Sequence, residues 1–372
     1  MSRSKRWRPE LALGAAGLFL VCWGLVHTSF WTHGELVDWP TYETYADRIL
    51  HHGLVPYRDF AVEYPPGALV TFLPPALFGD YPRAFAWEMV LLGVLLVAVV
   101  SYVRPAAAFF VALAPVLSGS LILSRFDLWP ALLAAAALAA LVRERHALGW
   151  ALLGAAISAK LWPGVIVPPA LAWSLRRGRR RAPLAGLAVV AIVFGAFALV
   201  APHGLWASLR GQASRPLQIE SLGASFLTTF GHPHVITSHG SQNLAGEGGV
   251  AAVLTVLQIV AVVGVWLAAL RDERPLLRHA AAAVCAFVAF GKVLSPQFLL
   301  WLVPLVPLVR GRRGVAAGLL LALALVLTQV WFPAHYWPYV GQFARAGAVL
   351  ARNLTLVALF AVLVAPLRDA PR

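Results

Sequence analysis

Long apolar runs, separated by short arginine-rich tracts, make up most of the 372-residue chain. A bilayer core of roughly 30 Å takes about 20 helical residues, or fewer where neighbouring helices shelter the segment. The pattern therefore predicts one all-α integral membrane domain over residues 1–372, with about 12 transmembrane helices. The expected spans are 10–30, 84–103, 105–123, 128–142, 147–160, 161–175, 182–201, 250–270, 277–292, 296–309, 314–332 and 347–366.

The composition agrees with this pattern. Hydrophobic residues make up 60% of the chain, charged residues only 12%, and the mean hydropathy is +0.75. Soluble domains carry about 25% charged residues, so an ordinary cytosolic enzyme is excluded. Cys22 and Cys285 both lie inside apolar runs, which excludes a disulfide framework. We expect the first run to stay as an uncleaved helix, because it is long and is followed by further spans.

The net charge of +14 is spread over short tracts between spans. Binding to nucleic acid would need a continuous basic stripe, so we expect no nucleic-acid partner. Short basic loops are typical of the cytoplasmic side of a membrane. We therefore predict a multi-pass protein of a bacterial plasma membrane, with both termini in the cytoplasm. The tracts are Arg3–Arg8, Arg143–Arg145, Arg176–Arg181, Arg271–Arg278 and Arg310–Arg313.

Two segments on the predicted outer side, 31–83 and 202–249, are too long for simple turns. The first holds seven of the 16 carboxylates, namely Glu35, Asp38, Glu43, Asp47, Asp59, Glu63 and Asp80. Within it, apolar residues at helical spacing predict an amphipathic helix over 40–52 lying on the membrane interface. Residues 68–78 are interrupted by two prolines and are too short to cross the membrane, so they are predicted either to dip into it or to lie beside it.

Several short motifs recur at the outer ends of the predicted helices. Together they resemble the GT-C superfamily of membrane glycosyltransferases, and specifically glycosyltransferase family 87, over most of the chain. The resemblance implies a GT-C-type helical bundle that transfers a sugar, by analogy mannose, from a polyprenyl-phosphate donor. It rests on Val37-Asp38-Trp39-Pro40-Thr41-Tyr42, Glu63-Tyr64-Pro65-Pro66, Ser124-Arg125-Phe126-Asp127-Leu128-Trp129-Pro130, Ser158-Ala159-Lys160-Leu161-Trp162-Pro163, Arg215-Pro216-Leu217-Gln218-Ile219-Glu220-Ser221 and Lys292-Val293-Leu294-Ser295-Pro296-Gln297.

The resemblance assigns catalysis to Asp38. An aspartate in the first outer loop of these enzymes takes a proton from the acceptor hydroxyl, typically worth about 10²–10⁴ in rate. Polyprenyl phosphate is already a good leaving group, so an inverting displacement needs no acid. The alternative role for Asp38 is capping of the helix at 40–52. However, Pro40 at the first helical position would make Trp39 the cap and place Asp38 one residue too early.

The remaining predicted site residues would bind substrate. Lys160 and Lys292 end apolar runs on the outer side, where an isolated charge indicates function, although a snorkelling side chain is the alternative. Arg125 suits either phosphate or a carboxylate partner. Asp127 could bind substrate or cap the helix that begins at Leu128. By resemblance, Glu63, Arg215, Glu220 and Gln297 complete the set, although an ordinary capped loop would equally explain Arg215 and Glu220.

Gln297 stands near the place where many family members carry a histidine after Ser-Pro. His335 lies at another outer helix end and could take that role, or could belong to an aromatic cluster at the membrane interface. His232, His234 and His239 lack acidic or cysteine companions at ligand spacing. We therefore expect no metal and no cofactor other than the lipid-linked sugar as co-substrate.

Three classes of function remain after these observations. The first is an inverting glycosyltransferase, whose partners are a polyprenyl-phosphate-sugar donor, a lipid or glycan acceptor and membrane lipids. The second is a lipid or small-molecule transporter, and the third is a non-catalytic scaffold. Transporters place charges near the midplane and often show internal repeats. In this chain the charges gather near one face, and carboxylates accompany an amphipathic helix, so the sequence favours the enzyme.

Overall fold

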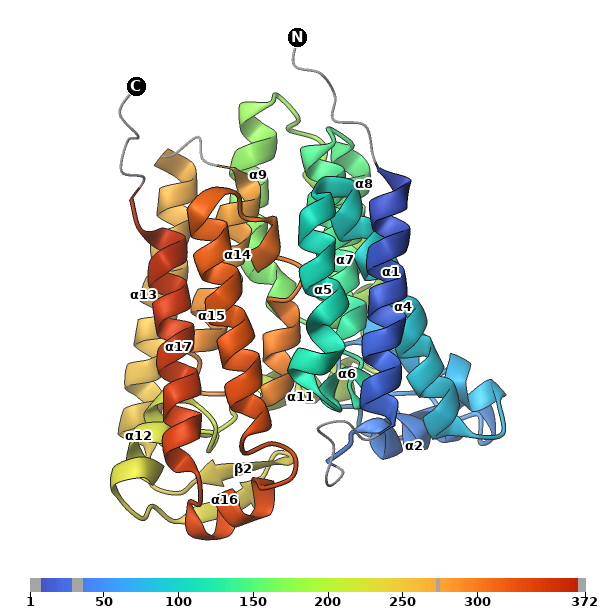
Figure 1. The fold of residues 1–372 in the computed structure, drawn as a ribbon. Helices are drawn as coiled ribbons and strands as arrows, with labels where there is room; N and C mark the ends of the chain where they lie inside the picture. The colour runs from blue at the N-terminus through green and yellow to red at the C-terminus, as the bar shows by residue number, and fades with distance from the viewer. Residues whose placement is uncertain (1–7, 29–35, 272–274, 367–372) are drawn as a thin grey trace.

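The structure is a computed structural model that describes residues 8–28, 36–271 and 275–366. The described chain is a bundle of helices with one short hairpin (Figure 1). Helix α1 (Pro9–His27) begins and α17 (Ala346–Val364) ends at the same end of the bundle. The arginine-bearing connections between α7 and α8 and between α9 and α10 also lie there. The cavity described below is built mainly from segments at the opposite end.

Six helices are long and apolar enough to cross a bilayer, by length and composition. The other expected spans are shorter helices or 3₁₀ segments, so the predicted number of about 12 crossings is not confirmed. Proline and glycine shorten several of them. The long helices are α1, α4 (Tyr81–Val103), α10 (Pro183–Val200), α13 (Gly248–Arg271), α15 (Gly311–Gln329) and α17. The shorter segments are α5 (Pro105–Ser118), α7 (Leu128–Val142), α8 (His146–Ala159), η3 (Trp162–Ile166) with α9 (Val167–Arg176), α14 (Leu276–Ala289), and η4 (Pro296–Trp301) with η5 (Val306–Leu308).

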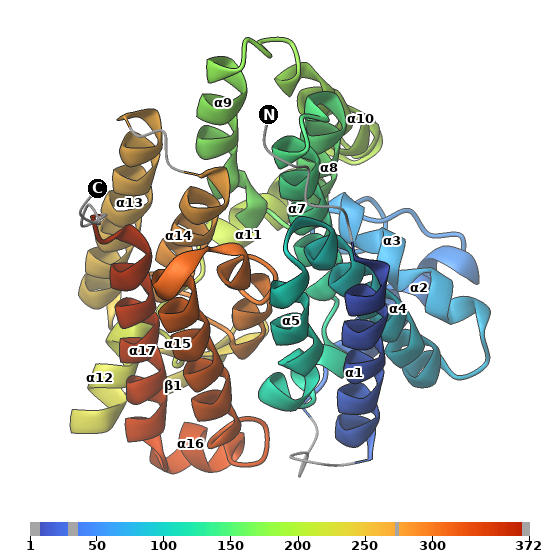
Figure 2. The ribbon, with the colours of Figure 1, turned by 45° about the horizontal axis from the view of Figure 1, so that its top comes forward.

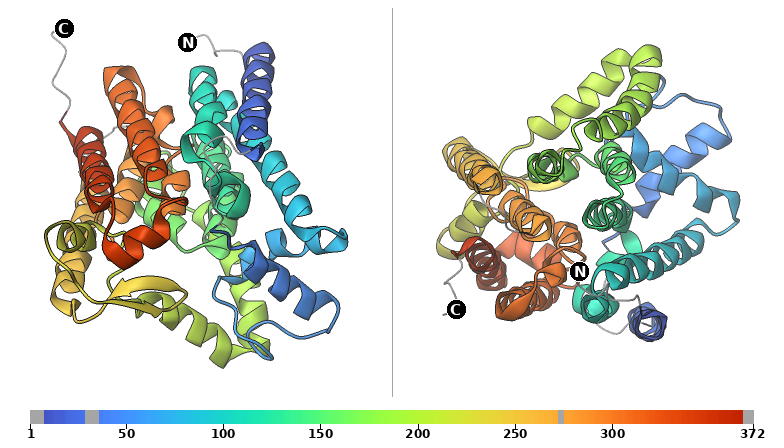
Figure 3. Two further views of the ribbon diagram at one scale, coloured as in Figure 1. Left: turned by 60° about the horizontal axis from the view of Figure 1, so that its bottom comes forward. Right: turned by 90° about the horizontal axis from the view of Figure 1, so that it is seen from above.

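The helices form two packed groups, seen end-on in the right view of Figure 3. Helices α1, α4, α5, α7, α8 and α10 form the first group, and α13, α14, α15 and α17 form the second. Each group has a buried, alanine-rich helix, α7 in the first and α14 in the second. Small side chains let neighbouring backbones approach closely, which is how helices associate in a membrane without a hydrophobic driving force.

Helix α10 lies at the edge of the first group, beside α8 (Figure 2). Among its residues only Gly186 is buried. A Cβ atom on Gly186 would lie 2.7 Å from the carbonyl oxygen of Trp150, and one on Gly154 would lie 2.4 Å from the carbonyl oxygen of Gly186. These contacts make α10 a lipid-facing helix that docks on α8 through a glycine contact.

The first outer segment forms α2 (Trp39–Leu50), η1 (Pro66–Ala68), α3 (Leu69–Phe72) and η2 (Pro74–Leu77). The predicted helix is present, and the proline-broken stretch is a pair of short turns. The position of this helix on the membrane interface stays a prediction, but Tyr42 on its apolar face is fully buried against protein. Its ring stacks on Phe72 at 4.3 Å and meets Phe126 edge-on at 5.6 Å. This aromatic contact anchors α2 and thus positions Asp38.

The second outer segment contains α11 (Pro202–Ala213), α12 (Leu222–Phe230), β1 (Val235–Ser238) and β2 (Ser241–Leu244). The strands form an antiparallel hairpin with Ser238 opposite Ser241 (Figure 3, left). His239 and Gly240 at the turn both have positive φ, as a tight two-residue hairpin turn requires. Residues 217–219 run beside β2, because Ile219 donates to Gln242 and Leu244 donates to Leu217. The remaining helices α6 (Leu121–Ser124) and α16 (Tyr336–Gln342) lie near the same end.

Candidate active site

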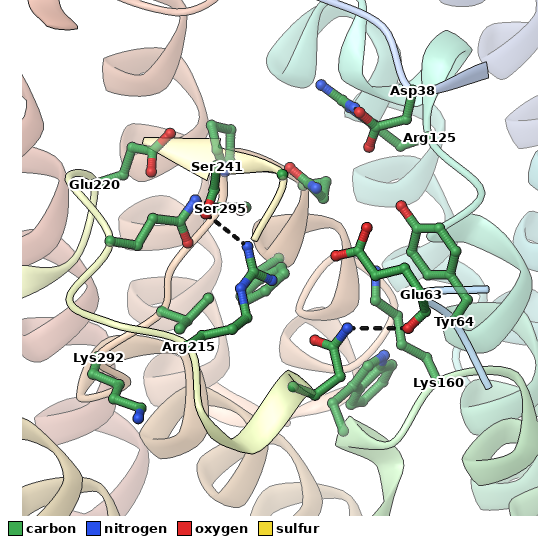
Figure 4. Close-up of a pocket in the computed structure, with 18 of the residues that line it drawn as sticks. Asp38, Glu63, Tyr64, Arg125, Lys160, Arg215, Glu220, Ser241, Lys292 and Ser295 are labelled. Carbon is green, nitrogen blue, oxygen red and sulfur yellow. Dashed lines mark hydrogen bonds and ion pairs between the residues drawn. The ribbon is translucent and has the colours of Figure 1, made fainter. Parts of the chain in front are cut away.

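A cavity of about 760 Å³ lies between the two helix groups, beside the two segments that the sequence predicts on the outer side. Ligand sites for small molecules commonly span 300–1,000 Å³. Figure 4 shows charged and polar side chains entering it from opposite walls. Of the nine residues expected at the site, Asp127 alone is not part of the lining. The other eight line the cavity: Asp38, Glu63, Arg125, Lys160, Arg215, Glu220, Lys292 and Gln297.

Asp38 forms an ion pair with Arg125 at one wall. The Asp38 side chain is 32% exposed and that of Arg125 is 7% exposed, so the carboxylate is the member of the pair that a substrate can reach. Arg125 also donates to the carbonyl of Leu36 at 3.0 Å, and the Tyr42 hydroxyl donates to Asp38 at 3.5 Å. These contacts fix the direction of the carboxylate. Of the two partners that the sequence left open for Arg125, a phosphate or a carboxylate, the structure shows the carboxylate of Asp38.

The expected position of the α2 cap is wrong by one residue. The helix begins at Trp39, which makes Asp38 the residue at the cap position, but the Asp38 side chain accepts no capping hydrogen bond from α2. Pro40 occupies the second helical position, where its missing N–H costs nothing because the first N–H groups of a helix have no partner within it. The alternative role as a cap is therefore not observed.

Lys160 follows the last residue of α8, and its ammonium donates to Asp127 Oδ1 at 2.7 Å. The same oxygen accepts from the Trp301 indole N–H at 2.5 Å. Asp127 is only 1% exposed and is not part of the cavity lining, so it does not face a ligand there directly. Asp127 also occupies the cap position of α7 without capping it. Its carboxylate is held by two side chains from distant parts of the chain.

Glu63 enters the cavity from the loop before η1, close to Tyr64 (Figure 4). Its backbone carbonyl accepts from Gln212 at 3.0 Å and from Ser208 at 3.3 Å, both on α11. A Cβ atom on Gly240, at the hairpin turn, would lie 3.7 Å from Glu63 Oε2. The two outer segments thus meet at Glu63. Among the described residues its carboxylate is not part of an ion pair.

The opposite wall carries two cations, Arg215 and Lys292 (Figure 4). Arg215 donates to the Ser241 hydroxyl at 3.0 Å, and Lys292 donates to the carbonyl of Ala213 at 3.2 Å. Neither has a carboxylate within ion-pair distance in the described part of the chain. Their positive charges are therefore available to an anionic ligand, whereas those of Arg125 and Lys160 are already compensated by Asp38 and Asp127.

Glu220 lies on this second wall and is only 2% exposed. Its backbone carbonyl accepts from Arg352 at 3.0 Å and Asn353 at 3.1 Å, both buried in α17. Burial raises the pKa of Glu220 to about 7, because desolvation outweighs the opposing effect of Arg352. The carboxyl group can therefore accept or release a proton near neutral pH.

Gln297 and the adjacent Phe298 both line the cavity at the start of η4. His335 does not line the cavity, and it precedes α16 beside an aromatic cluster. The histidines of the hairpin region gather no metal set, because no group of three or more His, Cys, Asp or Glu side chains suited to a metal occurs within residues 8–28, 36–271 and 275–366.

Sequence reasoning missed the hairpin and the residues that it contributes, Ser241 and Gln242. Gln218, which belongs to one of the motifs quoted from the sequence, also lines the cavity; its amide donates to the Ser295 hydroxyl at 2.8 Å and its backbone N–H donates to the carbonyl of Lys292. The turn His239-Gly240 between Val235-Ile236-Thr237-Ser238 and Ser241-Gln242-Asn243-Leu244 carried a detectable hairpin signal. The Gln218–Ser295 contact joins positions 77 residues apart, for which the sequence alone gives no signal.

A comparison with protein families adds to this geometry. The model of glycosyltransferase family 87 matches residues 62–296, more than half of the chain. The chain belongs to glycosyltransferase family 87. Its membership confirms the resemblance drawn from the motifs and makes the protein a glycosyltransferase. Asp38 precedes the matched region, so its assignment depends on the cavity geometry. A comparison with curated proteins gives no match.

A comparison with solved structures supports the same fold for this member of family 87. The crystal structure of ArnT from Cupriavidus metallidurans, bound to undecaprenyl phosphate, aligns with a TM-score of 0.50. The alignment covers 94% of this chain and 76% of ArnT at 14% sequence identity. At this identity the match shows a shared fold, that of a multi-pass membrane protein, and leaves the substrates of this chain to be established.

Proposed function

We propose that the protein transfers a sugar, with inversion, from a polyprenyl-phosphate carrier to a hydroxyl of a lipid or glycan acceptor in the bacterial envelope. One observation carries the proposal: the cavity has an accessible, oriented carboxylate on one wall and two uncompensated cations on the other. A reaction that removes a proton from one substrate and leaves charge on a phosphate needs both features.

In this mechanism Asp38 takes the proton of the acceptor hydroxyl as its oxygen attacks C1 of the donor sugar. The bond between C1 and the phosphate oxygen breaks, and its electron pair stays on the phosphate. Arg215 and Lys292 are the best-placed groups to hold that phosphate, since each can add a charge-assisted hydrogen bond. Arg125 and Lys160, which the sequence favoured for this task, act instead as partners of carboxylates.

Bound undecaprenyl phosphate in the ArnT structure supports a polyprenyl-phosphate carrier as the first donor to test. We propose mannose as its sugar on the basis of the family resemblance. The arginine-rich connections lie at the end of the bundle where α1 begins, and such tracts mark the cytoplasmic side. We therefore place the cavity on the outer side and both termini in the cytoplasm.

The test is an assay of purified protein with synthetic polyprenyl-phosphate sugars and a mixed envelope-lipid acceptor fraction. We expect a glycosylated product with inverted anomeric configuration, and at least about 100-fold slower turnover for Asp38→Asn. Thr44→Val, on an exposed face of α2, serves as the control and should keep turnover. Wild-type protein that moves labelled lipid across vesicles but forms no glycosidic bond would contradict the proposal.

A further inference from the structure

The wall that contains Lys160 has an unusual construction. Its ammonium lies over three aromatic rings, 4.7 Å from the centroid of Phe126, 5.3 Å from Trp301 and 5.7 Å from Phe298. Trp301 lies between Phe298 and Trp162, stacked on them with centroid distances of 4.0 and 5.0 Å. Aromatic surroundings of this kind attract cations. In this structure the cation is a residue of the chain itself.

Asp127 holds this assembly together from behind. One carboxylate oxygen accepts from both the Lys160 ammonium and the Trp301 indole, and its residue is 1% exposed. The three residues come from the start of α7, the end of α8 and the end of η4. Asp127 therefore fixes Lys160, at the end of α8, against Trp301 of η4, directly beside the cavity.

The pair of Lys160 and Asp127 has no net charge, but an ammonium has three N–H donors and Asp127 takes one. Such a pair attracts a phosphate more weakly than an uncompensated cation does, but because Lys160 lines the cavity and Asp127 does not, the ammonium and its free N–H donors face the ligand. Phe298 and Trp301, which also line the cavity, add apolar ring surface beside those donors. Donors next to an aromatic surface match a sugar ring, which has hydroxyls at its edge and C–H groups on its faces.

We propose that Lys160, Phe298 and Trp301 form the sugar subsite of the donor, with Asp127 as the residue that positions them. This inference rests on the proposed function and assigns the residues that contact the sugar. A fixed ammonium repels a second ammonium, so the subsite takes a neutral hexose and discriminates against an amino sugar. The phosphate then lies beyond the sugar, toward Arg215 and Lys292.

The experiment measures binding, without turnover, of three ligands: a polyprenyl-phosphate hexose, the corresponding polyprenyl-phosphate amino hexose, and polyprenyl phosphate without sugar. Wild type should bind the neutral hexose at least about 10-fold more tightly than the amino hexose. Phe298→Ala should weaken hexose binding about 10-fold and change binding of the sugar-free lipid less than 2-fold. Phe226→Ala, an exposed ring on α12, is the matched control and should change neither.

Asp127 is tested through its partner. Lys160→Met should reduce the preference for the neutral hexose over the amino hexose, and Asp127→Asn should weaken hexose binding. The double variant should bind no more weakly than Lys160→Met, since the two residues act as one unit. Additive losses, or equal losses for sugar-bearing and sugar-free lipid in a folded variant, would overturn the subsite. Failure of wild type to bind any of the lipids would instead overturn the proposed function.

Discussion

The ion pair between Asp38 and Arg125 predicts an asymmetry between two single substitutions. Asp38→Asn leaves the guanidinium of Arg125, only 7% exposed and with Nε lacking a partner, without a counter-charge. Breaking a buried pair costs about 3–5 kcal/mol, and we expect about 3 kcal/mol because Asp38 is 32% exposed. Arg125→Gln leaves the better-hydrated carboxylate and should cost about 1 kcal/mol.

Turnover should follow the same order, for a different reason. Asp38→Asn removes the proposed base and should slow turnover at least about 100-fold, whereas Arg125→Gln removes only orientation and should slow it about 10-fold. The double variant should regain most of the lost stability and none of the lost turnover. The assay pairs equilibrium unfolding in mixed micelles with single-turnover transfer.

The reasoning is refuted if Asp38→Asn turns over near the wild-type rate, or if the double variant regains activity. It is also refuted if Arg125→Gln destabilises the protein more than Asp38→Asn does. Leaving the buried guanidinium unpaired would then cost less stability than leaving the exposed carboxylate unpaired.

Three further predictions follow from other contacts. Arg215→Gln and Lys292→Gln should each raise the KM for the donor about 10-fold or more, with a smaller change in kcat if they hold the phosphate in the ground state; a change in kcat alone would contradict this. The pKa of Glu220 is raised from 4.5 to about 7, so the stability contributed by its protonated form is complete below about pH 4.5 and lost as pH rises through 7. Unfolding measured from pH 5 to 8 should show a loss on the order of 3 kcal/mol that Glu220→Gln removes. Gly186→Ile should undock α10 from α8 and lower the unfolding temperature, while Leu187→Ile on its exposed face should not.

The sequence predicted most of the fold because apolar runs and arginine tracts are local signals. It placed α2, α4 and α13 within a few residues, but could not give the number of crossings, because length alone does not show which short helices are sheltered. It also selected eight residues of one cavity. The sequence could not show which residues form ion pairs with one another. The pairs of Arg125 with Asp38 and of Lys160 with Asp127 depend on contacts between segments far apart in the chain.

The position of the two unpaired cations, Arg215 and Lys292, on one wall has a consequence for the release of the product phosphate. A phosphodiester donor carries one negative charge, while the monoester released after transfer carries about 1.5 to 2 at neutral pH. If Arg215 and Lys292 hold this phosphate, they bind the released polyprenyl phosphate more tightly than the donor, because its negative charge is larger. Departure of the spent carrier would then limit the cycle, and accumulated polyprenyl phosphate would slow the enzyme by competing with fresh donor.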